Sequence, residues 1–430
     1  MSKIPTTLSI LTICLVAVTS LPARAAEDEE NENGSFLSNL PVELHGFYEM
    51  RAGYRLRDDK YEKDMSIMEN RFQIDLYSYL EWADLRAKGD VIGDLVTEQV
   101  EFDLREINIA ARPLDFMDLK VGRQILTWGT GDLIFINDMF GKDWQAFFIG
   151  RDVEYLKAPS DAAKISLFSD WANLDLVYTP QFDSDRFITG ERISYFNSLL
   201  GRLAGRDAIV RTIKPDRWFA DDEIAARLYK NISNYELALY GYHGFWKSPG
   251  GLNPVMSRAI FPDLNVYGAS VRGTVGKGIG NVEVGYYDSA DDRSGTNPLI
   301  NNSEMRYLIG YTQEIGRDLT AGAQYYVEQM LNYDAYRSTA MPGPVRDRYR
   351  HVLTLRLTKL LMNQNLRCSL FAYYSPSDDD AYLRPNINYK LDDHFTAELG
   401  VNVFLGQYPH TFFGQFQNNT NAYLALRYSF

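Results

Sequence analysis

Residues 421–430 read NAYLALRYSF and end the chain on an aromatic residue. Every second side chain from Ala422 to Phe430 is apolar, and the side chains between them are mostly polar or small. Successive side chains of a β-strand point to opposite faces, so this stretch predicts a strand with one apolar face and one mixed face. Ten residues alone fit either a membrane barrel or the edge strand of a soluble β-sandwich.

The same alternation runs through the chain from Val42 onward. Leu44, Tyr48 and Met50 share one predicted face, opposite Glu49 and Arg51. Stretches of this kind predict about 18 strands, an even number as in single-chain bacterial barrels. After residues 42–56, 72–82 and 85–91 they lie near 100–112, 117–128, 162–169, 172–179, 222–231, 234–246, 265–276, 279–290, 303–314, 318–330, 348–360, 364–375, 381–391, 394–405 and 419–430.

The connections between these stretches alternate between short and long. Residues 83–84, 276–278 and 392–393 are short connections, whereas 130–161 and 180–221 are long ones. Outer-membrane barrels have short periplasmic turns and long extracellular loops, and a soluble sandwich has no reason to separate loop lengths in this way. We therefore predict an all-β protein, a transmembrane antiparallel up-and-down β-barrel.

The first 40 residues have a different character from the rest. Lys3, the apolar run 4–18 and the small-residue site at 23–25 are typical of a secretory signal peptide, predicted over residues 1–25. Residues 26–40 are acidic and low in complexity, which predicts a disordered periplasmic leader before a barrel over 41–430. No other stretch approaches the ~20 apolar residues of a membrane-spanning helix. We expect the protein in the outer membrane of a Gram-negative bacterium.

Composition excludes several classes of function. The net charge of −13 and the absence of a basic arm argue against a nucleic-acid partner. The five histidines are scattered, without a nucleophile motif or metal-ligand spacing beside them, so we expect no enzyme, no metal and no cofactor. Only Cys368 remains after the signal peptide, so no internal disulfide is expected.

If the apolar faces meet lipid, the other faces line the lumen, and there bases outnumber acids. Arginine dominates, which suits bidentate contacts with carboxylate or phosphate, although arginines and acids that brace neighbouring strands would give the same pattern. The predicted pore-lining residues are Arg51, Arg55, Arg86, Lys88, Arg227, Arg306, Arg356, Arg367, Arg384 and Arg427. Lys120 and Lys164 have the same parity.

Tyrosines form a second part of the predicted lumen. They could carry sugars along a pore or simply pack against loops that fold inward, and the sequence leaves both interpretations open. Those with inward parity are Tyr77, Tyr79, Tyr229, Tyr240, Tyr242, Tyr287, Tyr326, Tyr373, Tyr382 and Tyr423.

A loop over residues 130–160 is long and too apolar to lie freely in water. Folded into the barrel, it would bury its aromatic residues and set mixed charges across the pore, which selects solutes by size and charge. An outward lid or an oligomer contact is the alternative. The predicted constriction residues are Arg123, Asp138, Lys142, Asp143, Arg151, Asp152, Glu154 and Lys157. Parity is ambiguous at 105–106 and 122–123, which suggests bulges and leaves the side of Arg123 open.

The pattern Val121-Gly122-Arg123-Gln124…Trp128-Gly129…Asp132, after the strand with Leu104-Arg105-Glu106, resembles the alginate-export type of outer-membrane porin. The terminal Phe430 resembles the end of bacterial outer-membrane barrels in general. The porin resemblance implies a barrel with basic lumen residues that attract an anionic polysaccharide.

Together these observations predict a porin for passive or weakly selective diffusion of small hydrophilic solutes, anionic or saccharide. The expected partners are outer-membrane lipid and these solutes, and a homo-oligomer or a periplasmic partner stays open. The alternative is a barrel that serves a periplasmic protein in an export or electron-conduit complex.

Overall fold

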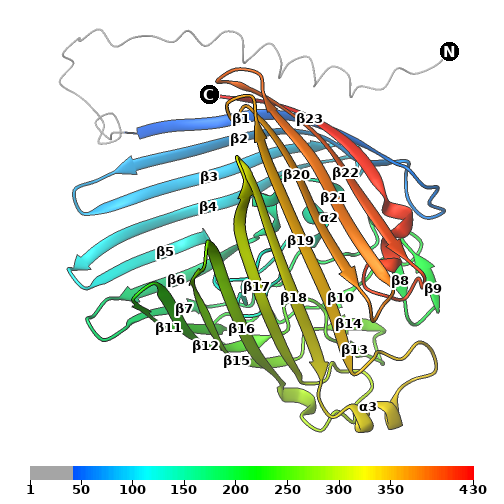
Figure 1. Cartoon of the computed structure of the whole chain (residues 1–430). Coiled ribbons are helices and arrows are strands. Elements are labelled where there is room, and N and C mark those ends of the chain that lie inside the picture. The colour runs from blue at the N-terminus through cyan, green and yellow to red at the C-terminus, as the bar shows by residue number, and fades with distance from the viewer. Residues whose placement is uncertain (1–41) are drawn as a thin grey trace, which may run out of the picture. The chain divides into compact units, whose positions relative to one another are not determined.

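Residues 42–430 are described by a computed structural model, and the predicted signal peptide and acidic leader lie outside the described residues. Eighteen strands pair with their neighbours in chain order, all antiparallel, and the last strand pairs with the first (Figure 1). The predicted barrel of about 18 strands is confirmed. Its strands are β1 (Val42–Arg55), β2 (Met65–Tyr79), β3 (Ala83–Asp94), β4 (Gln99–Leu114), β5 (Met117–Ile125), β6 (Pro159–Leu167), β7 (Asn173–Thr179), β11 (Glu223–Ile232), β12 (Tyr235–Phe245), β15 (Asp263–Val275), β16 (Gly278–Ser289), β17 (Glu304–Gly316), β18 (Leu319–Met330), β19 (Tyr349–Leu361), β20 (Leu366–Ser375), β21 (Asp380–Lys390), β22 (Phe395–Gly406) and β23 (Asn421–Ser429).

The stretch 421–430 closes the barrel. β23 lies against β1 with Arg427 opposite Glu49, and the backbone of Phe430 exchanges two hydrogen bonds with Gly46, at 3.0 and 3.1 Å. Closure removes the unpaired edge that an open sheet would leave. A closed barrel thereby satisfies every ladder hydrogen bond within the wall, as a bilayer requires.

The alternation of β1 separates two faces as predicted. Met50 and Tyr54 point outward and are about half exposed, whereas Glu49, Arg51 and Arg55 point inward and are almost fully buried. Leu424 and Leu426 of β23 continue the outward apolar surface. The wall therefore has an apolar outer face and a polar inner face, the arrangement of a membrane barrel.

Connections are short at one end of the barrel and long at the other, with two exceptions at the long-loop end. Residues 95–98 and 376–379 are tight turns there. The Asp94 carboxylate accepts hydrogen bonds from Val96 N and the Thr97 hydroxyl, both at 2.8 Å, which stabilises the first turn without a longer loop. Strict alternation of short and long connections is therefore wrong at these two places.

The long loops carry small helices and strands that the sequence pattern does not predict, because each is too short to show a clear periodicity. Within residues 42–430, no helix is long and apolar enough to cross a membrane. These elements are β8 (Tyr195–Asn197), β9 (Arg202–Ala204), β10 (Thr212–Ile213), β13 (Gly251–Asn253), β14 (Arg258–Ile260), η3 (Ala290–Asp292), α3 (Tyr333–Thr339) and η4 (Gly414–Asn419).

A buried carboxyl joins two of the long loops. The Glu62 side chain is 1% exposed and accepts a hydrogen bond from Arg206 Nε at 3.3 Å, and no group in the described part of the chain bonds its other oxygen. Burial raises the pKa of Glu62 to about 7, although Arg55 and Arg206 lower it in part. A proton on Glu62 thus favours the packed loops.

The raised pKa predicts that acid stabilises these loops. The contribution of the protonated Glu62 is complete below its usual pKa of 4.5 and is lost as the pH rises through about 7. Thermal unfolding of the Glu62→Gln variant in detergent should therefore depend less on pH over this range than that of the wild type. Glu98→Gln, at an exposed carboxylate, is the control. Identical pH profiles for wild type and Glu62→Gln would contradict this assignment.

Candidate functional site

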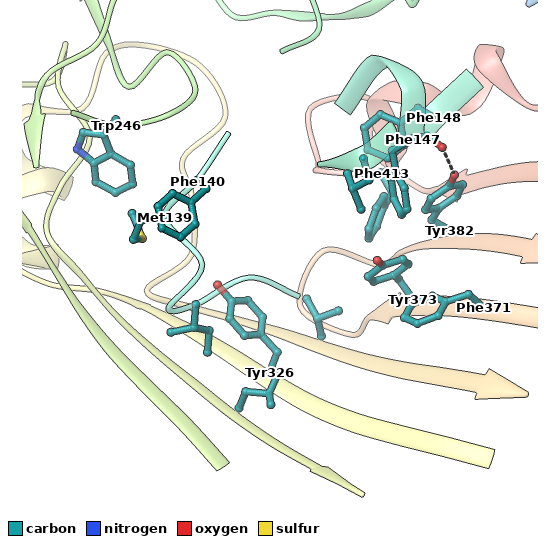
Figure 2. Packing of buried hydrophobic residues seen from close by; sticks show 14 of the residues in the cluster. Met139, Phe140, Phe147, Phe148, Trp246, Tyr326, Phe371, Tyr373, Tyr382 and Phe413 are labelled. Carbon is teal, nitrogen blue, oxygen red and sulfur yellow. Dashed lines mark hydrogen bonds between the residues drawn. The ribbon is translucent and has the colours of Figure 1, made fainter. Parts of the chain in front are cut away.

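The loop over residues 126–158, between β5 and β6, folds into the barrel. It carries the helix α2 (Trp144–Ile149) and the turn η2 (Val153–Leu156). Figure 2 shows Phe147 and Phe148 of α2 against Tyr382 of the inner wall, and the Phe148 ring lies 5.5 Å from the rings of both Tyr382 and Phe404. These aromatic side chains are buried, as the apolar content of the loop predicts.

One end of this loop is attached to the wall at β16, β18 and β19. Glu283 accepts hydrogen bonds from Thr130 N and, at 2.9 Å, from Gly131 N. Gln324 bonds both the N–H and the carbonyl of Asp132, whose carboxylate pairs with Arg356 at 2.7 Å. Backbone bonds to buried side chains hold this segment flat against the wall.

The other end is attached to β2, β3 and β4. Arg151 donates to the buried Glu69 at 2.5 Å, and the Tyr155 hydroxyl donates to Asp90 at 2.7 Å. The guanidinium groups of Arg71 and Arg105 lie 4.1 and 4.8 Å from the Tyr155 ring. Because the two attachments lie on different parts of the wall, the loop extends across the lumen.

Half of the predicted constriction residues support this loop rather than face water. Lys142 and Asp138 form a buried ion pair at 3.0 Å, and Asp143 caps the first turn of α2 through Ala146 N. Arg151 is held by Glu69 as described. These four charges fix the loop in place.

Three carboxylates of the loop face the lumen, and each lies close to a base of the wall. The side chains of Asp132, Asp152 and Glu154 are 43%, 37% and 42% exposed. Their partners lie at 2.7, 3.6 and 4.0 Å and are, in the same order, Arg356, Arg427 and Lys88. These three ion pairs join the lumen-facing edge of the loop to the wall. Lys157 is partly buried at the end of η2.

Asp132 was not predicted as a constriction residue. It follows the glycine-rich segment 129–131, whose backbone N–H groups bond Glu283. Glycines that let a backbone approach the wall closely are the signal that could have drawn attention to it.

Arg123 lies on the outward-facing set of β5 and not in the constriction. It is opposite Ile107, which is exposed to the outside, and it pairs with Asp161 at 2.9 Å and with the Leu104 carbonyl. The bulge predicted at 105–106 is present, because Lys88 pairs with Glu106 and Gly89 pairs with Leu104, so Arg105 has no partner residue in β3. At 122–123 the register is continuous, so no extra residue turns Arg123 inward.

Several predicted pore-lining arginines are buried braces. Arg51 bonds Glu49, Glu398 and the Gly150 carbonyl, and it is 3% exposed. Arg55 bonds the backbone carbonyls of Met65 in β2 and of Arg192 in a long loop, and Arg384 lies over the Phe147 ring. Arg306 lies over Tyr287 beside Glu304, and its side chain is 18% exposed. The bracing alternative therefore describes Arg51, Arg55 and Arg384, whereas Arg306 is braced and also partly exposed.

The other predicted pore-lining bases reach water inside the barrel or at its mouth. Arg86, Lys88, Arg227, Arg356 and Arg427 are between 13% and 35% exposed, and Arg367 is exposed. Of these, Arg86, Lys88 and Arg227 belong to one larger group on the inner wall.

We name this group the basic row, which comprises Arg86, Lys88, Lys120, Lys164 and Arg227 on β3, β5, β6 and β11. The register places Lys120 directly opposite Lys164. Like charges opposite each other in a sheet are destabilising, so the pair needs nearby acids or a functional reason.

Three of the acids beside the basic row lie deeper than its bases. Asp75, Glu106 and Asp175 are 12%, 5% and 5% exposed, whereas the bases of the row are 13–33% exposed. Their contacts with the row range from 2.8 Å, between Arg86 and Glu106, to 3.9 Å. Glu236, which pairs with Arg227 at 2.6 Å, and Glu154, 4.0 Å from Lys88, are 32% and 42% exposed. Lys120 and Lys164 each pair with a buried acid, so water meets mainly positive charge at these two lysines.

No family model and no curated protein matches the chain. Solved structures do match. Pseudomonas aeruginosa OccD3 (OpdP) has a TM-score of 0.54 and 10% identity, with 91% of each chain covered. Acinetobacter baumannii OccAB3 has a TM-score of 0.54 and 11% identity, over 91% of this chain and 99% of that one. P. aeruginosa OccK3 (OpdO) has a TM-score of 0.53 and 11% identity, over 90% and 95%.

The chain has a porin fold. The matched structures are outer-membrane porins, so they support the porin part of the resemblance seen in the sequence and not its alginate-export part. At about one identical residue in ten, the likeness concerns the fold, and the chemistry of the lumen depends on this chain's own residues. Among residues 42–430, no group of three or more His, Cys, Asp or Glu side chains could hold a metal ion.

Proposed function

We propose that this porin-fold protein is an outer-membrane channel through which small hydrophilic solutes diffuse passively, with a preference for anions. Lys120 and Lys164 of the basic row carry the proposal, because they are 33% and 29% exposed, whereas the acids that pair with them, Glu106 and Asp175, are each 5% exposed. A water-filled passage lined mainly by one sign of charge concentrates ions of the opposite sign.

The loop over residues 126–158 supplies the size limit in this proposal. Its acids Asp132, Asp152 and Glu154 stand opposite wall bases at the place where the loop crosses the lumen. A solute must pass beside these ion pairs through the cross-section that the loop leaves open, so bulky solutes are slowed.

A general sugar pathway along tyrosines has less support than an anion pathway. Seven of the ten inward tyrosines, including Tyr287, Tyr373 and Tyr382, are buried, mostly against the folded-in loop and neighbouring wall residues. The packing interpretation of these tyrosines therefore replaces the sugar-carrying one at those positions. Several charged side chains of the inner wall are more exposed than these seven tyrosines.

Proteoliposome swelling and planar-bilayer recording test whether the protein is a channel. The purified chain should show stepwise conductance and should admit small sugars and monoanions while excluding larger oligosaccharides. A variant lacking residues 130–155, with a short glycine–serine connection, should admit larger solutes if the loop sets the limit. Absence of both conductance and swelling from a correctly folded barrel would contradict the proposed function.

A further inference from the structure

Three stacked rings lie on the outer face of the barrel at the long-loop end of β18 and β19. Tyr325 of β18 and Tyr349 of β19 are 41% and 42% exposed, and His351 of β19 lies between them. The His351 ring is 6.0 Å from that of Tyr325 at an interplanar angle of 6°, and 6.3 Å from that of Tyr349 at 28°. A hydrogen bond of 2.7 Å joins the Tyr325 hydroxyl and His351 Nδ1. We name these three residues the outer platform.

The outer platform lies directly beyond the apolar band of the wall. The next outward residues of β19, Leu353 and Leu355, are 45% and 40% exposed, as expected of side chains that contact lipid chains. A long loop over residues 331–348 joins β18 to β19 at the platform's end of the barrel (Figure 1). Long loops are extracellular in outer-membrane barrels, so the platform lies at the depth of the lipid headgroups of the outer leaflet.

A basic side chain beside the outer platform is a second, independent feature. Arg348 is exposed, and its guanidinium lies 5.7 Å from the centroid of the Tyr349 ring. Its backbone carbonyl accepts a hydrogen bond from Met330 N at 2.9 Å, which fixes the chain at this position. Within residues 42–430, no carboxylate lies within 4.0 Å of this guanidinium and no group accepts a hydrogen bond from it. All of its N–H donors are therefore open to a ligand.

We propose that Arg348 and the outer platform bind the phosphorylated sugar headgroup of a glycolipid in the outer leaflet. The phosphate would accept hydrogen bonds from Arg348, and a sugar ring would lie against Tyr349. A guanidinium binds phosphate through two parallel hydrogen bonds. Tyrosine offers an apolar ring with a polar tip, which suits the boundary between lipid chains and headgroups. Because this site lies outside the lumen, it is independent of the solute that the channel passes.

Native mass spectrometry of the purified protein in detergent tests this site, with lipid A or its dephosphorylated form added in steps. The wild type should reach half-saturation at a lower concentration of the phosphorylated lipid. Arg348→Gln should raise that concentration about twofold to fivefold, the range for an exposed charged contact, and should leave binding of the dephosphorylated lipid unchanged. Tyr349→Leu should weaken binding of both lipids, because both carry the sugar rings.

Arg293→Gln is the matched control. Arg293 is also exposed at the long-loop end of the wall, but Asp288 already binds its guanidinium at 3.0 Å. This variant should bind both lipids as the wild type does. Equal binding of the two lipids by the wild type, or unchanged binding of the phosphorylated lipid by Arg348→Gln, would overturn the site. Equal losses in Arg348→Gln and Arg293→Gln would also overturn it, since they would reflect the general charge of this end of the barrel.

Discussion

Reversing Lys120 and Lys164 together, to Lys120→Glu and Lys164→Glu, should convert an anion-preferring channel into a cation-preferring one. The two side chains are opposite each other on β5 and β6 and are about one-third exposed to the lumen. Each lies 3.7 Å from one buried carboxylate, Glu106 and Asp175 respectively, so the reversal leaves a cluster of four acids where the lumen now presents bases.

The expected effect is large. A unit charge 4 Å from an ion contributes about 4 kcal/mol at the effective dielectric constant of about 20 near a protein surface. Salt screens part of this energy, yet a change of only about 1.4 kcal/mol alters a ratio tenfold. The chloride-to-potassium permeability ratio should therefore fall about tenfold or more, measured as a change in the sign of the reversal potential.

Lys230→Glu with Lys277→Glu is the matched control. Both lysines are exposed near the short turns, outside the inner wall, and their reversal changes the net charge by the same amount. This control should keep the selectivity of the wild type. If the two double variants shift the reversal potential equally, the general charge of the protein and not the basic row determines selectivity.

Replacing Glu69 by glutamine should release the loop over residues 126–158 from the wall. Glu69 is buried and pairs with Arg151, Arg192 and Arg71, at 2.5, 2.9 and 3.4 Å. Removing one partner of a buried charge pair costs about 3–5 kcal/mol, because the remaining charges stay buried without compensation. Arg71 and Arg192 keep Asp90 and Asp94 as partners, so the loss falls on Arg151, the arginine of the loop.

We expect larger and noisier single-channel currents from Glu69→Gln, together with entry of solutes that the wild type excludes. Glu98→Gln, at an exposed carboxylate of a neighbouring turn, should leave both properties unchanged. A Glu69→Gln barrel that folds and conducts as the wild type does would show that the other contacts of the loop hold it without Glu69.

The alternation of polar and apolar residues predicted the barrel and the side chains that point inward, because this alternation arises within each single strand. It did not predict how deeply each inward side chain lies. Arg51 and Arg86 have the same parity, yet the folded-in loop covers Arg51 through Gly150 and leaves Arg86 open. Whether an inward arginine is buried depends on the position of a loop that is distant in sequence, and local sequence patterns do not encode that position.

Local irregularity limited the prediction at two further positions. Gly122 has a φ of +119°, and a Cβ there would lie 2.3 Å from the Ile107 carbonyl oxygen, so only glycine fits at this position. The strand pairing is nevertheless continuous there, and no bulge is present. The glycine interrupts the alternation of polar and apolar residues at 122–123, as a bulge would. At Arg105 an extra residue is inserted into the strand, which is a true bulge. Backbone conformation distinguished the two cases.

The reversal potential of the wild-type channel across a potassium chloride gradient tests the central claim most directly. Lys120 and Lys164, which face the lumen beside buried acids, predict a reversal potential of the sign set by chloride. A reversal potential of the opposite sign, set by potassium, would contradict the anion preference assigned to the basic row.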